Sequence, residues 1–339
     1  MEWIVKNLWI SLPCLLLLLF VANLSLGSVP IPWREVVAIL MGKEASNPVW
    51  SDIVWDFRMT KALTCMLAGG ALAVAGLQMQ TLFRNALAGP DVLGLTSGAS
   101  LMVSLLLMSQ ASGFTLGTSS YPWAVATAAS LGSSFVFLLI VLISQRLRDN
   151  VSLLIIGLMI GAATSSVVSV LQYLSRAEEQ QPYLFWTFGN LGGLNWIEIQ
   201  LLAAIVLAGF MMAIFSTRSL NGLLLGSNYA QSIGVNISRS RFLIILSTSL
   251  LAGGVTAFCG PIAFVGLAVP HLVKLIIKTH NHRILLPAVL AGGCGLMLFC
   301  DILAQLPGST YVIPINAITA LIGAPVVIWI ILREKRISS

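Results

Sequence analysis

The sequence contains very little charge. Of its 339 residues, 9% are Asp, Glu, Lys or Arg and 58% are hydrophobic, and the mean hydropathy is +0.95. Soluble domains carry roughly 25% charged residues. No polar block is long enough for a soluble domain, whereas apolar runs of membrane-spanning length recur from end to end. We therefore predict a single all-α, polytopic transmembrane domain over residues 1–339, and we interpret the net charge of +6 as an orientation signal, not as a nucleic-acid footprint.

The residue clusters that catalysis or metal binding requires are also missing. His271, His280 and His282 are the only histidines, and no Cys, Asp or Glu stands near them at metal-ligand spacing. We interpret His280 and His282 as solvated loop residues and His271 as a structural residue. The five cysteines lie in apolar segments without a Cys-x-x-Cys pair, which indicates packing residues. We expect no catalytic residue, no metal site and no cofactor bound by this chain.

Ionisable residues are nearly absent from the interiors of the apolar runs. Arg58, Lys61 and Asp301 lie near the ends of such runs. A proton- or sodium-driven carrier usually needs ionisable groups at mid-membrane, so a stand-alone secondary carrier or channel is the disfavoured alternative. No Gly-x-x-x-x-Gly-Lys-Ser/Thr loop is present to hold ATP phosphates. An ATP-driven mechanism would therefore need a separate ATPase subunit on the inner face.

The apolar runs predict ten spans. The run from Leu8 to Leu26 resembles a signal peptide, but its length favours an uncleaved first helix. Residues 242–277 would form a helix of about 54 Å, which is longer than a hydrocarbon core of roughly 30 Å. We therefore expect a break at Gly260-Pro261, with 261–277 as a short or re-entrant span. The predicted spans are 8–27, 60–82, 92–109, 121–143, 151–173, 196–215, 242–259, 261–277, 285–303 and 313–332.

The basic residues predict the orientation of these spans. With the N-terminus inside, 13 of the 18 Lys and Arg residues fall in inner segments. This asymmetry predicts that both termini are cytoplasmic. The outer segments 28–57 and 175–195 combine acidic and aromatic residues, so we expect interfacial helices that contact lipid headgroups.

The stretch RNALAGPDVLGLTSGA, residues 84–99, cannot be a plain membrane helix, because it contains Pro and several Gly between two apolar segments. Non-helical backbone within the membrane is tolerated only where it is buried in protein or lines a water-filled cavity. Two alternatives remain open: a pathway wall, or an ordinary turn at the membrane surface. The candidate pathway residues are Asn85, Pro90, Gly94, Ser97 and Gly98.

Two short segments resemble one another. LAGGALAVAG at 67–76 and LAGGVTAFCG at 251–260 align without a gap, in the second and seventh predicted spans. The layout directs these spans oppositely across the membrane, as in the inverted repeats of many transporters. A third LAGG occurs at 290–293. Small residues at this spacing also serve close helix packing, which is the alternative interpretation.

The inner loop at about 216–241 is the best candidate for docking a partner. Its sequence predicts a short amphipathic helix from Leu223 to Ile233, ended by Gly234 and flanked by polar and basic residues. Such a helix, lying parallel to the membrane, fits a groove on a partner protein. The alternative is a membrane-surface helix without a partner.

Four segments together resemble the FecCD-type (BtuC-like) permease subunits of ABC importers for ferric siderophores, haem and vitamin B12. They are RNALAGPDVLGLTSGA at 84–99, LLLGSNYAQSIGVN at 223–236, GPIAFVGLAVPHLVK at 260–274 and ITALIGAPVVIWIILR at 318–333. The resemblance implies a type II importer permease of ten helices in the inner membrane. It further implies a second permease copy, in a homodimer or with a close homologue, two ATPase subunits that bind ATP-Mg inside, and a substrate-binding protein outside.

The resemblance also implies roles for single residues. Arg58 and Lys61 match two basic positions that pair with acidic residues of the binding protein. Gly260, Pro261 and Pro270 join the helix breaks that shape the pathway. The residues that match the coupling helix, which receives the ATPase stroke, are Leu225, Gly226, Ser227, Ala230 and Gly234.

The sequence departs from the family pattern at four positions. Ala86 stands where proline is usual, and Lys274 where arginine is commoner. Near the last outer loop, Gln305 replaces a basic residue and Asn316 a glycine. We expect the outer docking contact to be weaker or differently placed there.

Overall fold

Apolar helices make up nearly all of the computed structural model, which describes residues 2–27, 29–108, 121–147, 150–305 and 312–337. No strand occurs within these ranges. The long helices are α1 (Glu2–Ser25), α4 (Thr60–Phe83), α6 (Tyr121–Ser144), α7 (Asn150–Leu174), α9 (Trp196–Phe215), α15 (His282–Ala304) and α16 (Ile315–Ile337). The shorter helices are α2 (Trp33–Leu40), α3 (Pro48–Asp52), α5 (Leu95–Met108), α8 (Ala177–Thr187), α10 (Thr217–Leu224), α11 (Ser227–Ser232), α12 (Ile237–Thr248), α13 (Gly254–Cys259) and α14 (Val265–Ile277).

Each of the ten predicted spans contains a helix, and the predicted all-α class is confirmed. In the described part of the chain, six helices are long and apolar enough to cross a membrane by length and composition. The remaining predicted spans correspond to shorter apolar helices, in α1, α5, α14 and α16. The number of complete crossings therefore stays a prediction.

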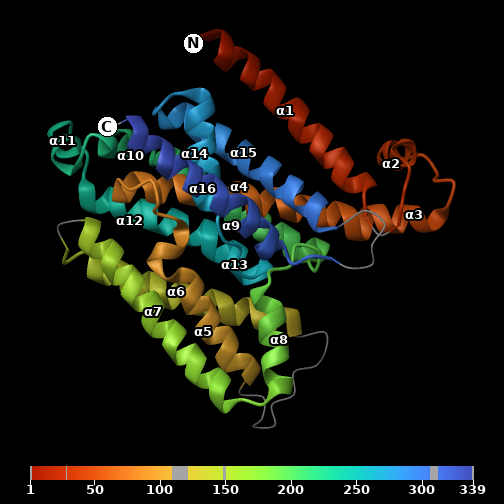
Figure 1. Ribbon diagram of the computed structural model, residues 1–339, viewed down its shortest axis with the longest axis horizontal. Helices are drawn as coiled ribbons and strands as arrows, with labels where there is room; N and C mark the ends of the chain where they lie inside the picture. Colours follow the sequence, from red (N-terminus) through yellow and green to blue (C-terminus); the bar gives the residue numbers. More distant parts are fainter. Residues whose placement is uncertain (1, 28, 109–120, 148–149, 306–311, 338–339) are drawn as a thin grey trace.

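The predicted outer helices and the inner loop lie at different ends of the bundle. Figure 1 shows α10 and α11 at one end of the bundle and α2 and α3 at the opposite end. Residues 28–57 form α2, α3 and a π-helical turn, Ile53–Met59, that continues into α4, and residues 175–195 contain α8. The short helices expected in both segments are thus present.

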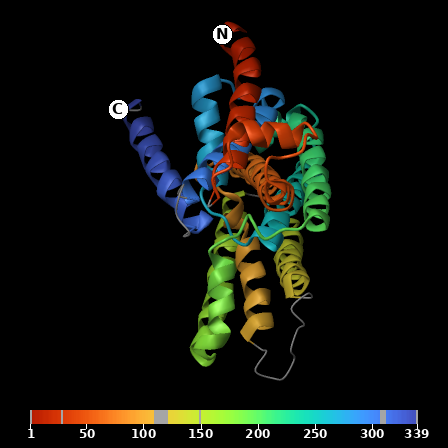
Figure 2. The same ribbon diagram turned by 90° about the vertical axis from the view of Figure 1, so that its right-hand side faces the viewer.

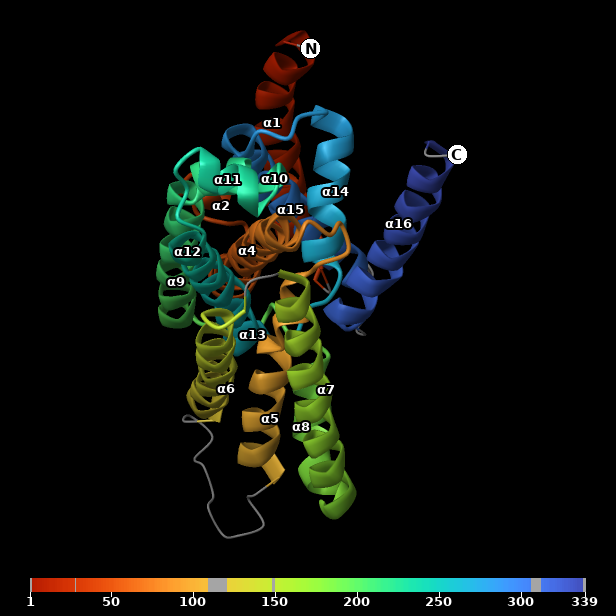
Figure 3. The ribbon, with the colours of Figure 1, turned by 90° about the vertical axis from the view of Figure 1, so that its left-hand side faces the viewer.

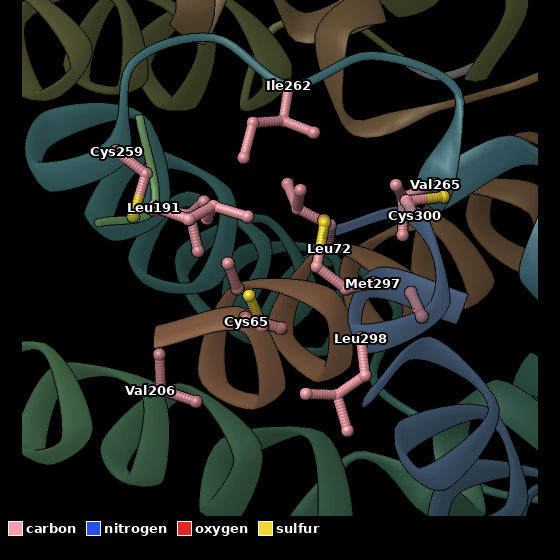
Figure 4. Packing of buried hydrophobic residues seen from close by; sticks show 14 of the residues in the cluster. Cys65, Leu72, Leu191, Val206, Cys259, Ile262, Val265, Met297, Leu298 and Cys300 are labelled. Atoms are coloured by element: carbon pink, nitrogen blue, oxygen red, sulfur yellow. The ribbon is translucent and has the colours of Figure 1, made fainter. Parts of the chain in front are cut away.

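Helix α4 is the centre of the fold. Nearly every residue of α4 is buried, and α9, α12, α14 and α15 pack around it. In Figure 4, Cys65 and Leu72 of α4 share a cluster with Val206 of α9, Met297 of α15 and Ile262. All five cysteines are free thiols; Cys14 is exposed and the other four are buried. The interpretation of most cysteines as packing residues agrees with this arrangement.

A second group of helices, α5, α6, α7 and α8, packs beside this core (Figure 3). Helix α7 is largely exposed: only 17% of its most apolar stretch of 18 residues is buried. Helix α16 leans away from the other helices in both side views (Figures 2 and 3). These exposed apolar helices are the surfaces that lipid or another subunit must cover.

Candidate functional site

The first helix break follows α4. Arg84 ends α4 in the left-handed conformation, with φ 50°, and the Asn85 side chain accepts a hydrogen bond from the backbone N–H of Leu87 at 2.9 Å. A 3₁₀ turn, Pro90–Leu93, follows, and Gly94 at φ 72° precedes α5. Asn85 is exposed, but Pro90 and Gly94 are buried. The segment thus begins as a surface turn and then enters the protein interior, and the role of its residues in a pathway wall stays a prediction.

The second break separates α13 from α14, at the predicted Gly260-Pro261. Gly260 has φ 74°, and a Cβ there would lie 2.5 Å from the carbonyl oxygen of Trp186. Phe264, with φ 68°, starts α14. Asn316 of α16 accepts a hydrogen bond from the backbone N–H of Ala263 at 3.1 Å. Asn316 is one of the departures from the family pattern. Its side chain gives the backbone N–H of Ala263, which lies between the two helices, a hydrogen-bond acceptor.

The two breaks meet beside α4. A Cβ on Gly266 would lie 2.7 Å from Cδ of Pro90, so these residues are in close contact. Pro270 lies inside α14 and has no N–H to donate to the Gly266 carbonyl, four residues earlier. Gly76 of α4 packs against that carbonyl so closely that a Cβ would overlap it. The predicted break residues Pro90 and Pro270 thus belong to one contact region.

A polar pair, Gln80 and Lys274, lies beside this contact region. Gln80 of α4 donates a hydrogen bond to the carbonyl oxygen of Leu267 at 3.2 Å. Its other side-chain atom accepts a hydrogen bond from Lys274 of α14 at 3.0 Å. Lys274, a second departure from the family pattern, thus connects α14 to α4 and is not a free loop charge.

Ser97 and Gly98 lie in the first turn of α5, and they differ in burial and in the helix that each one faces. Gly98 is buried against α6, where a Cβ would lie 2.6 Å from the carbonyl oxygen of Gly132. Gly98 therefore packs α5 against α6 in this chain, and its place in a pathway wall stays a prediction. Ser97 is half-buried and lies near Gly161 of α7.

The predicted single helix Leu223–Ile233 is wrong. The chain instead forms α10 and α11, and Leu225 and Gly226 make the corner between them. Gly226 has φ 107°, a conformation that ends the helix and that a residue with a side chain rarely adopts. Gly234, with φ 83°, follows α11 and terminates it as predicted.

The α11 corner exposes an apolar face. Leu225, Tyr229 and Ile233 are 64%, 47% and 54% exposed, and they lie before, within and directly after α11. Ser227 is exposed, and Ala230 is buried against α10. An exposed apolar face beside a rigid attachment is suited to docking a partner.

The two predicted docking residues are both engaged within the chain. Arg58 is buried, and its guanidinium donates hydrogen bonds to the carbonyl oxygens of Leu24 at 2.6 Å and Ser25 at 2.9 Å and to that of Val29. These are carbonyls at the end of α1 and just beyond it, where helices lack internal partners. Arg58 is therefore not the free outer charge that we expected.

Lys61 belongs to a buried network around Asp301. Its Nζ lies 2.8 Å from one carboxylate oxygen of Asp301. The other carboxylate oxygen accepts hydrogen bonds from Asn23 at 2.8 Å and Gln305 at 2.6 Å. Gln305, where the family pattern has a basic residue, thus adds a neutral hydrogen-bond donor to the carboxylate. The network connects α1, α4 and α15.

A recess of about 880 Å³ opens beside this network. Lys61 remains 19% exposed at its side chain and lines the recess, whereas the side chain of Asp301 is 3% exposed. The other residues that line the recess include Arg58, Phe188, Asn190 and Gln305. A partner's side chain can therefore reach Lys61 from the recess more readily than it can reach Asp301.

His282 was expected in a solvated loop, and this is wrong. It opens α15 and is 1% exposed. Asn281 caps this helix by accepting a hydrogen bond from the backbone N–H of Arg283 at 3.0 Å. An asparagine followed by an apolar run is the usual start signal of a helix, and it could have placed His282 inside the fold.

Sequence reasoning also missed Arg241. This buried residue of α12 donates hydrogen bonds to the carbonyl oxygens of Ser144 at 3.1 Å and Leu147 at 2.9 Å and to the side chain of Asn150 at 2.8 Å. It joins the end of α6 to the start of α7. The sequence shows Arg241 only as one more basic residue, because it does not reveal which distant carbonyls the side chain meets.

Residues 15–333 match the model of the FecCD transport family. The haemin transport system permease protein HmuU of Yersinia pestis is 32% identical, over 95% of this chain and 94% of the relative. The vitamin B12 import system permease protein BtuC of Vibrio cholerae is 33% identical, over 88% and 90%. A solved structure, an inward-facing conformation of a metal-chelate type ABC transporter, superposes with a TM-score of 0.84 and 28% identity, over 97% of this chain and 99% of that one.

Proposed function

Because the chain belongs to the FecCD transport family, we propose that it is the permease subunit of an ATP-driven importer that carries a metal chelate across the cytoplasmic membrane. The observation that carries this proposal is the match along nearly the whole chain to permeases named for haemin and vitamin B12 transport. A ferric siderophore, haem or cobalamin is the proposed cargo. The permease is a transport subunit and not an enzyme, so hydrolysis of ATP-Mg falls to partner ATPase subunits.

The exposed face of α11 is the proposed contact for the ATPase. Leu225, Tyr229 and Ile233 would fill an apolar groove on that subunit, while the buried Ala230 holds α11 on α10. Gly226 and Gly234 set the direction of the chain at each end of α11. In this proposal α10 and α11 together are the coupling element, with Ser227 at its first exposed turn.

The recess beside Lys61 is the proposed contact for a substrate-binding protein. Lys61 lines the recess and is partly exposed, so an acidic side chain of the partner can approach it. Arg58 supports the same wall by binding the end of α1. We therefore assign direct docking to Lys61 and a supporting role to Arg58.

A second copy of the chain is the proposed cover for α7. Val151, Ile155, Met159 and Val170 are each more than half exposed along this helix. The helix break at Pro90 to Gly94 packs against α7, because a Cβ on Gly94 would lie 3.1 Å from the carbonyl oxygen of Gly157. A pathway between two copies would therefore run along α7, and the break would support its wall.

The proposed topology places both termini in the cytoplasm. The C-terminus lies at the same end of the bundle as α10 and α11 (Figure 1), which the ATPase must reach from the cytoplasm. The excess of basic residues in the same inner segments supports this orientation.

Transport in proteoliposomes tests the proposal. The permease, the ATPase subunit and the binding protein from the same genome would be reconstituted, and uptake of cobalamin, haem and a ferric siderophore would be measured with and without ATP. We expect ATP-dependent uptake of one cargo, and none with an ATPase subunit that cannot hydrolyse ATP. Uptake by the permease alone, driven by an ion gradient, would show instead the alternative function, a stand-alone secondary carrier.

A further inference from the structure

A chain of hydrogen bonds connects α10 to the centre of the fold. The side-chain oxygen of Asn221 in α10 accepts hydrogen bonds from the backbone N–H of His282 at 2.9 Å and from Nδ1 of its ring at 2.8 Å. The amide nitrogen of Asn221 donates to the side-chain oxygen of Asn281 at 3.2 Å. On the other side of the ring, Nε2 of His282 lies 2.9 Å from the hydroxyl oxygen of Thr81 in α4.

The donors and acceptors in this chain can be assigned. A backbone N–H can only donate, so the Asn221 atom that faces it must be the oxygen, and the proton of the His282 ring is then on Nδ1. His282 is 1% exposed, and the one ion pair found in the described ranges is Lys61 with Asp301. A buried imidazolium without a carboxylate is costly, so the ring is neutral. Its Nε2 therefore accepts the hydroxyl proton of Thr81, for which the carbonyl oxygen of Leu77 in α4, 2.8 Å from the same hydroxyl oxygen, is the competing acceptor.

The chain joins three helices that apolar contacts alone would leave free to slide. Leu220 and Leu223 of α10 are buried with Met79 and Leu82 of α4, but such contacts have no direction. Hydrogen bonds fix the rotation and height of one helix against another, because their energy depends on angle. Asn221, His282 and Thr81 thus hold α10 in register with α15 and α4.

Helix α10 is the immediate neighbour of the proposed docking helix. Two residues, Leu225 and Gly226, separate α10 from α11. At its other end, the chain of hydrogen bonds reaches α4, whose Gly76 packs against the Gly266 carbonyl beside the two helix breaks. A displacement of α11 therefore has a continuous route to the helix that supports the proposed pathway.

We propose that Asn221, His282 and Thr81 are positioning residues that transmit the displacement of α11 to α4 and α15 during transport. This inference rests on the proposed function, because it assumes that α11 receives force from an ATPase. The role of the three residues is to prevent α10 from moving independently of α4.

Thr81→Val tests the transmission role, because valine has the shape of threonine but lacks the hydroxyl. In the reconstituted complex we expect ATP hydrolysis to continue while cargo uptake per ATP hydrolysed falls roughly tenfold, equivalent to about 1.4 kcal/mol. Thr81→Ser restores the hydroxyl and should restore most of the uptake. Thr64→Val is the matched control, since Thr64 is also buried in α4 and its hydroxyl bonds only within the helix, to Thr60 at 2.8 Å.

Equal uptake per ATP in Thr81→Val and Thr64→Val would overturn the transmission role. A purely structural role would lower the yield of folded complex without changing the ratio of uptake to hydrolysis.

A measurement without ATP separates this inference from the proposed function. Asn221→Ala and Thr81→Val would be made singly and together in the permease, and thermal unfolding would be recorded in detergent. We expect the two decreases in Tm to be less than additive, because either change already breaks the chain through His282. Additive decreases would overturn the chain of hydrogen bonds whatever the transport result. Uptake by the wild-type complex that does not depend on ATP would instead overturn the proposed function, and with it the transmission role.

Discussion

Gly69 of α4 and Gly293 of α15 lie face to face where the two helices cross. A Cβ on either residue would overlap the carbonyl oxygen of the other. Gly69 belongs to the LAGG segment at 67–70 and Gly293 to the one at 290–293, so the first and third copies of this tetrapeptide form one contact. The small residues of both segments allow the two backbones to approach.

Gly293→Ala should destabilise the permease by about 1–3 kcal/mol, because its methyl group meets backbone and the helices must separate. Thermal unfolding in detergent measures the effect. Gly295→Ala is the matched control on the same helix, since its Cβ would have ordinary contacts with Leu16 at 3.4 Å and Leu19 at 3.7 Å. Equal Tm values for the two variants would contradict the close crossing.

Asp301→Ala should lower stability by about 3 kcal/mol, since it leaves Lys61 without its carboxylate in a mostly buried site. The double variant Lys61→Met/Asp301→Asn removes both charges and should recover much of the loss. Thermal unfolding of both variants checks this. A double variant less stable than Asp301→Ala would show that the ion pair itself, and not the unpaired charge, determines the stability.

The same double variant tests the docking role of Lys61. It keeps the outer helices together but removes the positive charge from the recess, so the affinity of the substrate-binding protein should fall roughly tenfold, as for loss of one charged contact. Association with the ATPase subunit should not change, because no residue of α10 or α11 lines the recess. Unchanged affinity for the binding protein would show that Lys61 serves the fold alone.

Tyr229→Asp should weaken association with the ATPase subunit, because it places a charge in the centre of the exposed apolar face of α11. Co-purification and the ATPase rate of the complex measure the loss, which we expect to be at least about tenfold in affinity. Ser238→Asp is the control, since Ser238 is exposed in the first turn of α12, outside this face. Equal losses in both variants would indicate a general effect of negative charge at this end of the bundle.

The pattern of apolar runs predicted most of the fold. The break at Gly260-Pro261 and the end of α11 at Gly234 follow from local backbone rules, because glycine supplies positive φ and proline removes a hydrogen bond. The single helix over 223–233 was wrong for a local reason as well. Gly226, at φ 107°, ends the helix there. The sequence alone does not distinguish a glycine that ends a helix from one that a helix tolerates in its interior.

The roles of the polar residues could not be predicted in this way. Arg58 and His282 have partners that are distant in the chain: Arg58 binds carbonyls near residue 25, and His282 binds Thr81 and Asn221. Charge and position near a span end indicated an outer surface or a solvated loop. Whether such a residue finds a buried partner depends on which helices become neighbours.

The sequence by itself determined that this chain is a helical membrane protein, where its helices break, and the family to which it is related. These properties depend on hydrophobicity, on backbone conformation and on the order of motifs, all of which are local. The tertiary structure alone decided that the first LAGG meets the third, that Lys61 meets Asp301, and that His282 joins α10 to α4. Each of these contacts joins segments far apart in the chain, so it exists only once the helices have packed.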